Sequence, residues 1–393
     1  MHMRKATAAL VGLLLAGVAA TPAQAETIRS QQWHLNSMKA DDVWKISTGG
    51  GVTVAVIDSG IDRIPELEGQ VLPGKDFEPE GVRGDERTDT SSHGTTMAAL
   101  IAGSGKHPSG DGAFGLAPGA KILPIRVPHE TESATPSWAA AIRYAADSDA
   151  KIINVSMGLP TEPEKDQVRA EAVKYALSKG KLIFAAVGND GDTLNEIAYP
   201  AATPGVVGVA AVGVNGEPTK ESAHGAQVDL AAPGIDMVTA CAGKTGLCTS
   251  HGTSDATALA SASAALLWSA HPDWTNNQVL RVLLNTAGKP NDGSQRNDYI
   301  GYGIVRPRIA VPTPGDPGPA DVFPLPDLAA ADAAKNPSPS TDGKAPGSAA
   351  SKPAPQADEK KTGSALPWIA LGLGACVLIG GAVTAVLVRR KSH

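Results

Sequence analysis

Cysteine, aromatic side chains and clustered positive charge are all scarce in this sequence. It contains 3 cysteines among 393 residues, aromatic residues make up 4% of it, and the formal net charge is -6. Basic residues gather in blocks only near the two termini, so the chain lacks the positive footprint with which proteins bind phosphate backbones. We therefore expect no nucleic acid among its partners.

Two of the three cysteines lie close together, in the segment CAGKTGLC from Cys241 to Cys248. In an exported protein such a pair is typical of a local disulfide, and two free thiols or a pair of metal ligands are the alternatives. No further cysteine stands near them, since Cys376 lies far along the chain. We predict a disulfide between Cys241 and Cys248, no metal site and no other cofactor.

The first 25 residues have the composition of a secretory signal peptide. Arg4 and Lys5 give a positive start, residues 8–20 form an uncharged apolar run, and Ala23-Gln24-Ala25 fits a small-residue cleavage site. A membrane anchor is the alternative, but the run is shorter than the roughly 20 residues that span a bilayer. We predict a signal peptide over residues 1–25 and export of the rest.

A second apolar run lies near the C-terminus. Residues 366–388 contain no charged side chain and are followed by Arg389, Arg390 and Lys391. A buried core helix is the alternative, but the low-complexity sequence before this run offers no core to join. The pattern predicts a transmembrane helix over 366–388 with residues 389–393 in the cytoplasm, because basic residues stay on that side. The rest of the mature chain would then be extracellular.

Residues 311–365 are rich in Pro, Ala, Gly, Ser and Asp, and Phe323 is their one aromatic residue. Such a composition buries too little apolar surface to offset the entropy of folding. We predict a disordered linker over 311–365 between the folded domain and the membrane. Its reach would lie between about 40 Å for a flexible coil and about 170 Å for a polyproline-like chain.

The remaining residues, 26–310, are enough for one large domain with a substantial core. Short β-branched runs alternate with alanine-rich amphipathic segments, which is typical of an α/β fold with a doubly wound, mainly parallel sheet flanked by helices. The expected strands are 52–57, 121–127, 151–156, 181–187 and 206–212, and the expected helices are 93–102, 137–146 and 164–178, with two more after Thr253 and Thr275.

In such sheets, functional side chains gather where strands end and helices begin. Asp58 ends the first expected strand, His93 begins a helix and Ser254 begins another. A serine hydroxyl needs a base to remove its proton, and that imidazole needs a carboxylate to fix its tautomer. Each residue alone also fits a turn or a helix start. Together they predict a catalytic triad of Asp58, His93 and Ser254.

A tetrahedral intermediate also needs hydrogen-bond donors at its negatively charged oxygen. Asn189, just past the fourth expected strand, offers a side-chain amide, and the backbone N–H of Ser254 at a helix start offers a second donor. A simple turn residue is the alternative for Asn189. Gly252 leaves space for a substrate carbonyl. We predict an oxyanion hole that contains Asn189.

These motifs resemble those of the subtilase family of serine proteases. The matching segments are VAVIDSGID (54–62), HGT (93–95), GLAPGA (115–120), INVSMG (153–158), AAVGN (185–189), LAAPG (230–234) and GTS (252–254). The chain order Asp, His, Ser is that of subtilisin. The resemblance implies a serine endopeptidase that works through an acyl-enzyme intermediate. It also implies that a substrate strand pairs with the backbone of Ser156, Met157 and Gly158.

The sequence departs from the family pattern at three places. Ser92 stands where a glycine commonly precedes the histidine, and Asp255 follows Ser254 where an apolar residue is usual. The pair Ala258-Leu259 stands where the family usually has Pro-His. None of these changes removes a predicted catalytic group. A carboxylate beside the nucleophile is expected to alter nearby pKa values or to disfavour acidic substrates.

The order of signal peptide, protease domain, linker and C-terminal span resembles the mycosins, membrane-anchored subtilases associated with type VII secretion. That resemblance implies a polypeptide substrate, a single-pass location in the cell membrane, and partners among type VII secretion components. The alternative function is a scaffold or stabilising subunit of a membrane secretion complex, with incidental catalysis. The four predicted catalytic groups favour hydrolysis, because binding alone would not require them.

Overall fold

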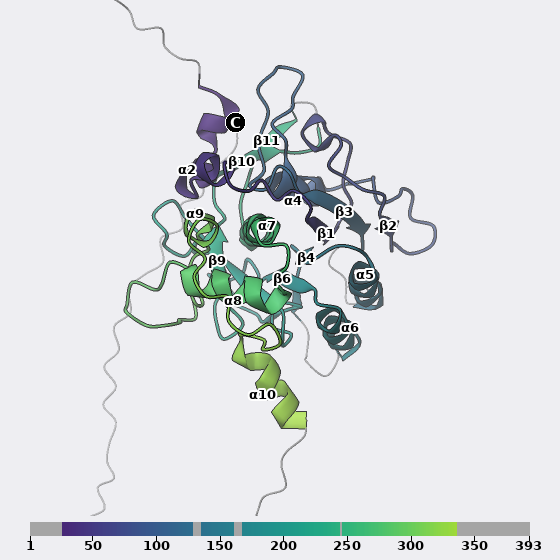
Figure 1. Ribbon diagram of the computed structural model, residues 1–393. Helices are drawn as coiled ribbons and strands as arrows, with labels where there is room; N and C mark the ends of the chain where they lie inside the picture. The colour runs from purple at the N-terminus through teal and green to yellow at the C-terminus, as the bar shows by residue number, and fades with distance from the viewer. Residues whose placement is uncertain (1–25, 129–134, 161–166, 244–245, 336–393) are drawn as a thin grey trace, which may run out of the picture. The chain divides into compact units, whose positions relative to one another are not determined.

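The computed structural model describes residues 26–128, 135–160, 167–243 and 246–335, which form an α/β domain (Figure 1). Its central sheet has 7 strands in the order β2-β3-β1-β4-β6-β8-β9, and all neighbours are parallel. The strands are β1 (Thr53–Asp58), β2 (Lys75–Asp76), β3 (Lys121–Arg126), β4 (Ile152–Val155), β6 (Leu182–Ala186), β8 (Val207–Val212) and β9 (Leu230–Pro233). Two short antiparallel pairs lie outside this sheet: β5 (Leu159–Pro160) with β7 (Ala198–Tyr199), and β10 (Met237–Ala240) with β11 (Leu247–Ser250).

Helices cover both faces of the sheet. One layer contains α4 (His93–Ala102), α7 (Thr253–Ala270) and α8 (Asn276–Thr286), and the other contains α5 (Thr135–Asp147) and α6 (Gln167–Ser178). Alternate residues of β1 enter the two cores, since Val54 and Val56 pack with the first layer and Ala55 and Ile57 with the second. Strands buried on both faces need apolar side chains at every position, which explains their near-continuous hydrophobic runs.

The predicted α/β fold with a parallel sheet flanked by helices is confirmed. The five expected strands appear as β1, β3, β4, β6 and β8, with ends within one residue of the prediction. All five expected helices are present, and α4 has the predicted bounds. The edge strands β2 and β9 are not predicted by the pattern, because β2 is very short and β9 carries a proline, which an edge strand tolerates.

Three short helices precede the first strand: α1 (Ile28–Gln31), α2 (Trp33–Ser37) and α3 (Ala40–Val43). Their polar side chains hold this segment to distant backbone. Gln32 Nε2 donates to the carbonyls of Phe114 and Val238 at 2.7 and 3.2 Å, and Trp33 Nε1 donates to Ile235 at 2.9 Å. The segment after the predicted signal peptide is therefore an integral part of the domain. A 3-10 helix, η1 (Pro65–Leu67), follows β1.

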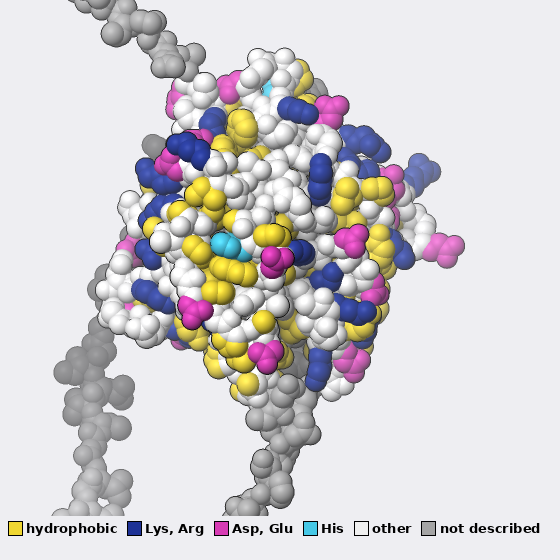
Figure 2. Space-filling view, viewed as in Figure 1, with side chains coloured by type: hydrophobic (Ala, Val, Ile, Leu, Met, Phe, Trp, Pro, Cys, Tyr) yellow, Lys and Arg dark blue, Asp and Glu magenta, His cyan; other side chains and the backbone are white. Residues whose placement is uncertain are grey.

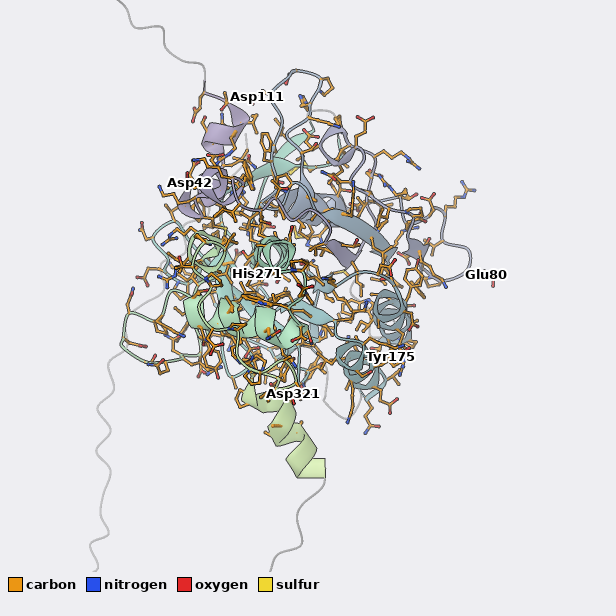
Figure 3. The ribbon with its side chains drawn as sticks, in the orientation of Figure 1. Asp42, Glu80, Asp111, Tyr175, His271 and Asp321 are labelled. Carbon is orange, nitrogen blue, oxygen red and sulfur yellow. A yellow bond between two sulfur atoms is a disulfide. The ribbon has the colours of Figure 1, made fainter. Side chains whose placement is uncertain are left out.

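The predicted boundary at residue 310 is wrong. After α9 (Pro307–Ala310), residues 311–325 form a C-terminal strap that packs on the domain, and α10 (Pro326–Lys335) follows it. Val311 and Leu325 are 3% and 2% exposed and belong to the main core. Asp321, labelled in Figure 3, lies in the strap just before α10.

Polar side chains of α8 bind the carbonyl oxygens of the strap. Arg281 donates to Pro317 and Pro319 at 2.7 and 2.8 Å and also to Val322. The boundary is wrong because proline lacks a backbone N–H but retains its carbonyl oxygen, which still accepts hydrogen bonds. A proline-rich segment can therefore be bound by side-chain donors from another element. Gln278 Nε2 adds a bond to Gly318 at 3.0 Å, and Thr275 and Asn277 bind Ala320 at 3.0 and 2.9 Å.

Several predicted segments lie outside the described residues. They are the signal peptide at 1–25, the rest of the linker at 336–365, the transmembrane helix at 366–388 and the tail at 389–393. Within residues 26–335 as far as they are described, no helix is long and apolar enough to cross a bilayer. On the face shown in Figure 2, acidic and basic side chains are interspersed, with hydrophobic side chains scattered between them.

Candidate active site

The end of β1 and the start of α4 bring Asp58 and His93 together. His93 Nδ1 and Asp58 Oδ1 are 2.7 Å apart, the Asp58 side chain is 0% exposed and the His93 side chain is 29% exposed. Asp58 Oδ1 also accepts the backbone N–H of Ser59 at 2.8 Å. The carboxylate is therefore fixed by His93 and by both the N–H and the hydroxyl of Ser59, and the histidine keeps one edge toward solvent.

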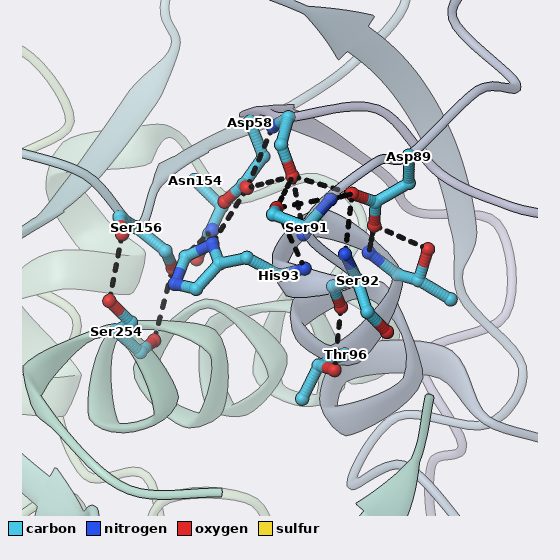
Figure 4. A network of polar contacts seen from close by, with 12 residues as sticks. Asp58, Asp89, Ser91, Ser92, His93, Thr96, Asn154, Ser156 and Ser254 are labelled. Atoms are coloured by element: carbon cyan, nitrogen blue, oxygen red, sulfur yellow. Dashed lines mark hydrogen bonds and ion pairs between the residues drawn. The ribbon is translucent and has the colours of Figure 1, made fainter. Parts of the chain in front are cut away.

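Asp89 links these two segments, and the sequence analysis did not single it out. Its carboxylate accepts bonds from Ser59 Oγ at 2.9 Å, from Ser92 N at 2.9 Å, and from Thr95 N and Oγ1 at 2.8 and 2.6 Å (Figure 4). Local sequence gives no signal for this residue, because the N-cap of α4 is Ser92 and Asp89 lies three residues before it. Asp89 thus ties the end of β1 to the first turn of α4.

Ser92 explains the first departure from the family pattern. It has a left-handed backbone, with φ 66 and ψ 1, a conformation that glycine adopts at lower cost. Its side chain makes a bond that glycine cannot make, since Ser92 Oγ accepts the N–H of Ala242 at 2.8 Å. The residue therefore fastens the start of α4 to the loop after β10.

Ser254 lies in the first turn of α7, beside the His93 ring and on the side away from Asp58 (Figure 4). Its side chain donates to the carbonyl oxygen of Ser156 at 2.8 Å, and Ser156 Oγ donates to the Ser254 carbonyl at 3.0 Å. Asn154 Nδ2 donates to Ser156 Oγ at 2.9 Å. The structure thus joins Asp58 to His93 by a hydrogen bond and joins Ser254 to Ser156 of the predicted substrate-binding segment.

Asn189 lies next to the start of α7. Its Oδ1 accepts the backbone N–H of Thr253 at 2.8 Å and the Thr253 hydroxyl at 3.0 Å. Gly252 adopts φ 120, and a Cβ there would lie 3.0 Å from Asn189 Nδ2. These bonds engage the oxygen of the Asn189 amide and leave its Nδ2 amino group next to Gly252.

Residues Ser156, Met157 and Gly158 follow β4 and lead into β5. Met157 is 4% exposed and belongs to the core, so its side chain does not face a ligand. A Cβ on Gly158 would lie 3.0 Å from Ala198 Cβ, which shows how closely this segment approaches β7. Its backbone contacts Ser254 through the carbonyl oxygen of Ser156.

The predicted cysteine pair lies on the β10–β11 hairpin, at the edge of the site. The Cα atoms of Cys241 and Cys248 are 6.1 Å apart, a separation within the disulfide range. Both residues line a cavity of about 310 Å³ together with His93, Ser92 and Ser250. The pair is therefore placed to stabilise one wall of the space in front of the histidine.

The predicted absence of a metal stays a prediction. No group of three or more His, Cys, Asp or Glu side chains that could hold a metal ion occurs in the described part of the chain. The residues around His93 combine one imidazole, buried carboxylates and hydroxyl groups, which are the groups that transfer protons.

The electrostatic surroundings of His93 favour its protonated form. Burial of the ring lowers its pKa, but Asp58 raises it through charge and hydrogen bonding, and the charges of Asp255 and Asp89 raise it further. The net result is a pKa of about 9 for His93. The imidazole therefore becomes available as a base as the pH rises toward that value.

Comparisons with known proteins identify the family of the chain. Residues 49–303 match the subtilase family. Mycosin-1 from Mycobacterium tuberculosis is 31% identical over 340 residues, which cover 73% of this chain and 74% of that protein. Subtilisin E from Bacillus subtilis is 36% identical over 267 residues, covering 67% of this chain and 66% of its own length.

A solved structure gives the same assignment. MycP1 from the ESX-1 type VII secretion system aligns with a TM-score of 0.65 at 28% identity, covering 77% of this chain and 91% of that one. The family match spans more than half of the sequence and includes β1, α4 and α7, the elements that carry Asp58, His93 and Ser254. The chain belongs to the subtilase family of serine endopeptidases, and its similarity extends to the mycosins.

Proposed function

We propose that the chain is a membrane-anchored, mycosin-like endopeptidase in which Asp58, His93 and Ser254 are the catalytic triad. The observation that carries this proposal is the 2.7 Å contact between His93 Nδ1 and the buried Asp58 carboxylate, with Ser254 beside the same ring. A carboxylate on one ring nitrogen fixes the tautomer and leaves the other nitrogen to act as a base.

In this mechanism the Ser254 hydroxyl attacks the carbonyl carbon of the scissile peptide bond while His93 Nε2 takes its proton. The hydroxyl donates to the Ser156 carbonyl at 2.8 Å in the structure, so the proton must be redirected toward His93 when substrate binds. Asp58 then stabilises the imidazolium that forms.

The negative charge that develops on the carbonyl oxygen needs donors. Asn189 Nδ2 and the backbone N–H of Ser254 are the proposed pair, because Thr253 holds the other end of the Asn189 amide. His93 next gives its proton to the leaving amine, and an acyl-enzyme remains on Ser254. Water, activated by the same histidine, hydrolyses that ester and restores the hydroxyl.

Covalent labelling by a fluorophosphonate tests the nucleophile. The wild-type protein should be labelled and Ser254→Ala should not. Ser263→Ala is the matched control, since Ser263 lies on the same helix and donates to the Leu259 carbonyl at 2.7 Å, away from the site. Labelling that survives Ser254→Ala would contradict the assignment. Secretion that persists in a labelling-deficient Ser254→Ala strain would favour the scaffold function.

We also propose that residues 366–388 anchor the protein in the cell membrane, with the catalytic domain outside and partners in a type VII secretion system. The support is the uncharged run, the basic residues after it, and the similarity to MycP1 from the ESX-1 system. Deletion of 366–393 should move the protein from the membrane fraction to the medium. Retention of the shortened protein on membranes would contradict this anchor.

We further propose that Cys241 and Cys248 form a disulfide in the exported protein. The Cα separation of 6.1 Å and the hairpin that joins them support this pairing. Mass spectrometry after treatment with iodoacetamide should show alkylation of the two residues only when a reductant is added first. Alkylation without a reductant would contradict the bond.

A further inference from the structure

Asp255 is a buried carboxyl group that the proposed mechanism leaves unused. It follows Ser254 in the first turn of α7 and is 0% exposed. Its Oδ1 accepts a hydrogen bond from Ser250 Oγ at 2.8 Å, and its Oδ2 is buried without a hydrogen-bond partner among the described residues. A carboxylate in such a place is costly unless a positive charge lies near it.

His93 is placed to supply that charge. Ser250, the hydrogen-bond partner of Asp255, lines the same cavity of about 310 Å³ as His93. Asp255 therefore lies behind one wall of the space that the histidine faces. Burial raises the pKa of Asp255 to about 6, although the bond from Ser250 and the charge of His93 lower it.

The other ionisable groups around this pair come from three further segments. Asp58 in β1 and Asp89 before α4 act on His93, while His251 lowers the pKa of Asp255 and Glu221 raises it. His251 is exposed and lies 2.9 Å from Glu221, so these two charges largely balance and are screened by solvent. Asp58 and Asp89 accept backbone N–H groups of Ser59 and Thr95, so replacing either carboxylate would also disturb the backbone that positions His93. The side chain of Asp255 is bound by the Ser250 hydroxyl, so its charge can be removed without breaking a bond to the backbone.

We propose that Asp255 is a positioning residue of the active site, which stabilises the protonated form of His93 and thereby sets the lower pH limit of catalysis. This proposal rests on the proposed function of His93 as the general base. The coupling acts between about pH 6, where Asp255 gains its charge, and about pH 9, where His93 loses its proton. Removal of the charge leaves more His93 neutral in that window, so Ser254 is activated at lower pH.

An NMR titration of His93 tests the coupling directly. Full-length protein with ¹³C-labelled histidine is compared with Asp255→Asn, and a His93→Gln variant assigns the signal. We expect the His93 midpoint to move to lower pH in Asp255→Asn. The matched control is Asp236→Asn, which removes an exposed carboxylate that acts on His251, and its His93 midpoint should stay unchanged.

Asp255→Ser is a second neutral variant, in case the amide is not accommodated in the buried position. An unchanged His93 midpoint in both neutral variants would overturn the proposal. This measurement does not need an active enzyme. If the wild type did not react with a fluorophosphonate at any pH, the assignment of the triad would be wrong. The titration would still decide whether Asp255 changes the midpoint of His93.

The rate of fluorophosphonate labelling from about pH 5.5 to about pH 10 then tests the effect on catalysis. In Asp255→Asn the rate near pH 7.5 should rise several-fold relative to the rate at pH 10, because more histidine is neutral. Below about pH 6 the two proteins should converge, because wild-type Asp255 is then protonated. A shifted titration with an unshifted labelling profile would overturn the catalytic role of Asp255.

Discussion

The contact between β1 and α4 depends on the absence of a side chain at residue 94. A Cβ on Gly94 would lie 2.2 Å from the Gly60 carbonyl oxygen and 3.1 Å from Asp58 Cβ. The two backbones can approach this closely only because glycine stands there, and their approach sets the 2.7 Å distance between His93 and Asp58. The glycine in the His-Gly-Thr segment thus serves the geometry of the pair.

Gly94→Ala should therefore disrupt the active site with little loss of the remaining fold. The methyl group must push α4 away from β1, and a misplacement of about 1 Å between catalytic groups costs about 100-fold in rate. Fluorophosphonate labelling should fall by about that factor. Gly50→Ala is the control, because its Cβ would meet no heavy atom within 4 Å. Wild-type labelling of Gly94→Ala would contradict this view.

Asn189→Ala tests the oxyanion donor. Loss of the corresponding type of donor in a subtilisin lowers kcat by about 100- to 1,000-fold, and we expect the same range here. KM for a peptide substrate should change little, since the bond forms mainly in the transition state. Thr253→Val, which removes the hydroxyl bonded to Asn189 Oδ1 but leaves Nδ2, should cost less. Equal losses in kcat for the two variants would argue against Asn189 as the donor.

At the scale of elements, the sequence predicted the regular parts of the domain and missed the irregular ones. Strands such as β4 and β6 are buried on both faces, so their composition identifies them. The α4 helix begins at a recognisable motif. Helices α1 to α3 are only four or five residues long and depend on tertiary bonds such as that from Gln32 to Phe114. Local patterns do not contain that information.

The residues of the candidate site also divide into those that the sequence predicts and those that it misses. Asp58, His93, Ser254 and Asn189 stand at strand ends and helix starts, where topology alone brings side chains together. Asp89 could not be assigned a role from its neighbours, because its function depends on Ser59, a residue of another segment. The C-terminal strap was missed for a related reason: Val311 and Leu325 are sparse anchors, and a composition averaged over the whole linker hides them.

Arg281→Ala tests how the strap is held. Arg281 binds three strap carbonyls, so its loss should loosen residues 311–325 and cost about 1 kcal/mol of stability. Hydrogen–deuterium exchange should show faster exchange in this segment and unchanged exchange in β1 and α7. Lys220→Ala, at an exposed position away from the strap, is the control. Unchanged exchange of the strap in Arg281→Ala would contradict its role.

For the whole molecule, a partly buried acid, Asp229, makes stability depend on pH. Burial raises the pKa of Asp229 to about 8, and the charge of Asp327 raises it further, although the Gly208 N–H bond and Arg296 lower it. The folded protein therefore keeps a proton that the unfolded chain releases near pH 3.8. The free energy of unfolding should fall as pH rises between these values, by at most about 1.4 kcal/mol per pH unit.

Asp229→Asn should remove this part of the pH dependence. Urea unfolding at about pH 5.5 and about pH 8 should show a smaller loss of stability in the variant than in the wild type, because the amide does not ionise. Asp298→Asn is the control, since Asp298 is 59% exposed and paired with Arg296 at 2.9 Å. A loss of stability equal to that of the wild type would show that Asp229 is not the responsible group.

The strap also determines how the domain responds to mechanical force. Tension applied to the chain beyond Lys335 reaches α10 and the strap before it reaches the sheet. Bonds from Arg281 and Gln278 to neighbouring carbonyls bear such a load together and pass it to α8. A pull on the C-terminal end of the described residues would therefore act on α8 through these side chains before it reached the first turn of α7.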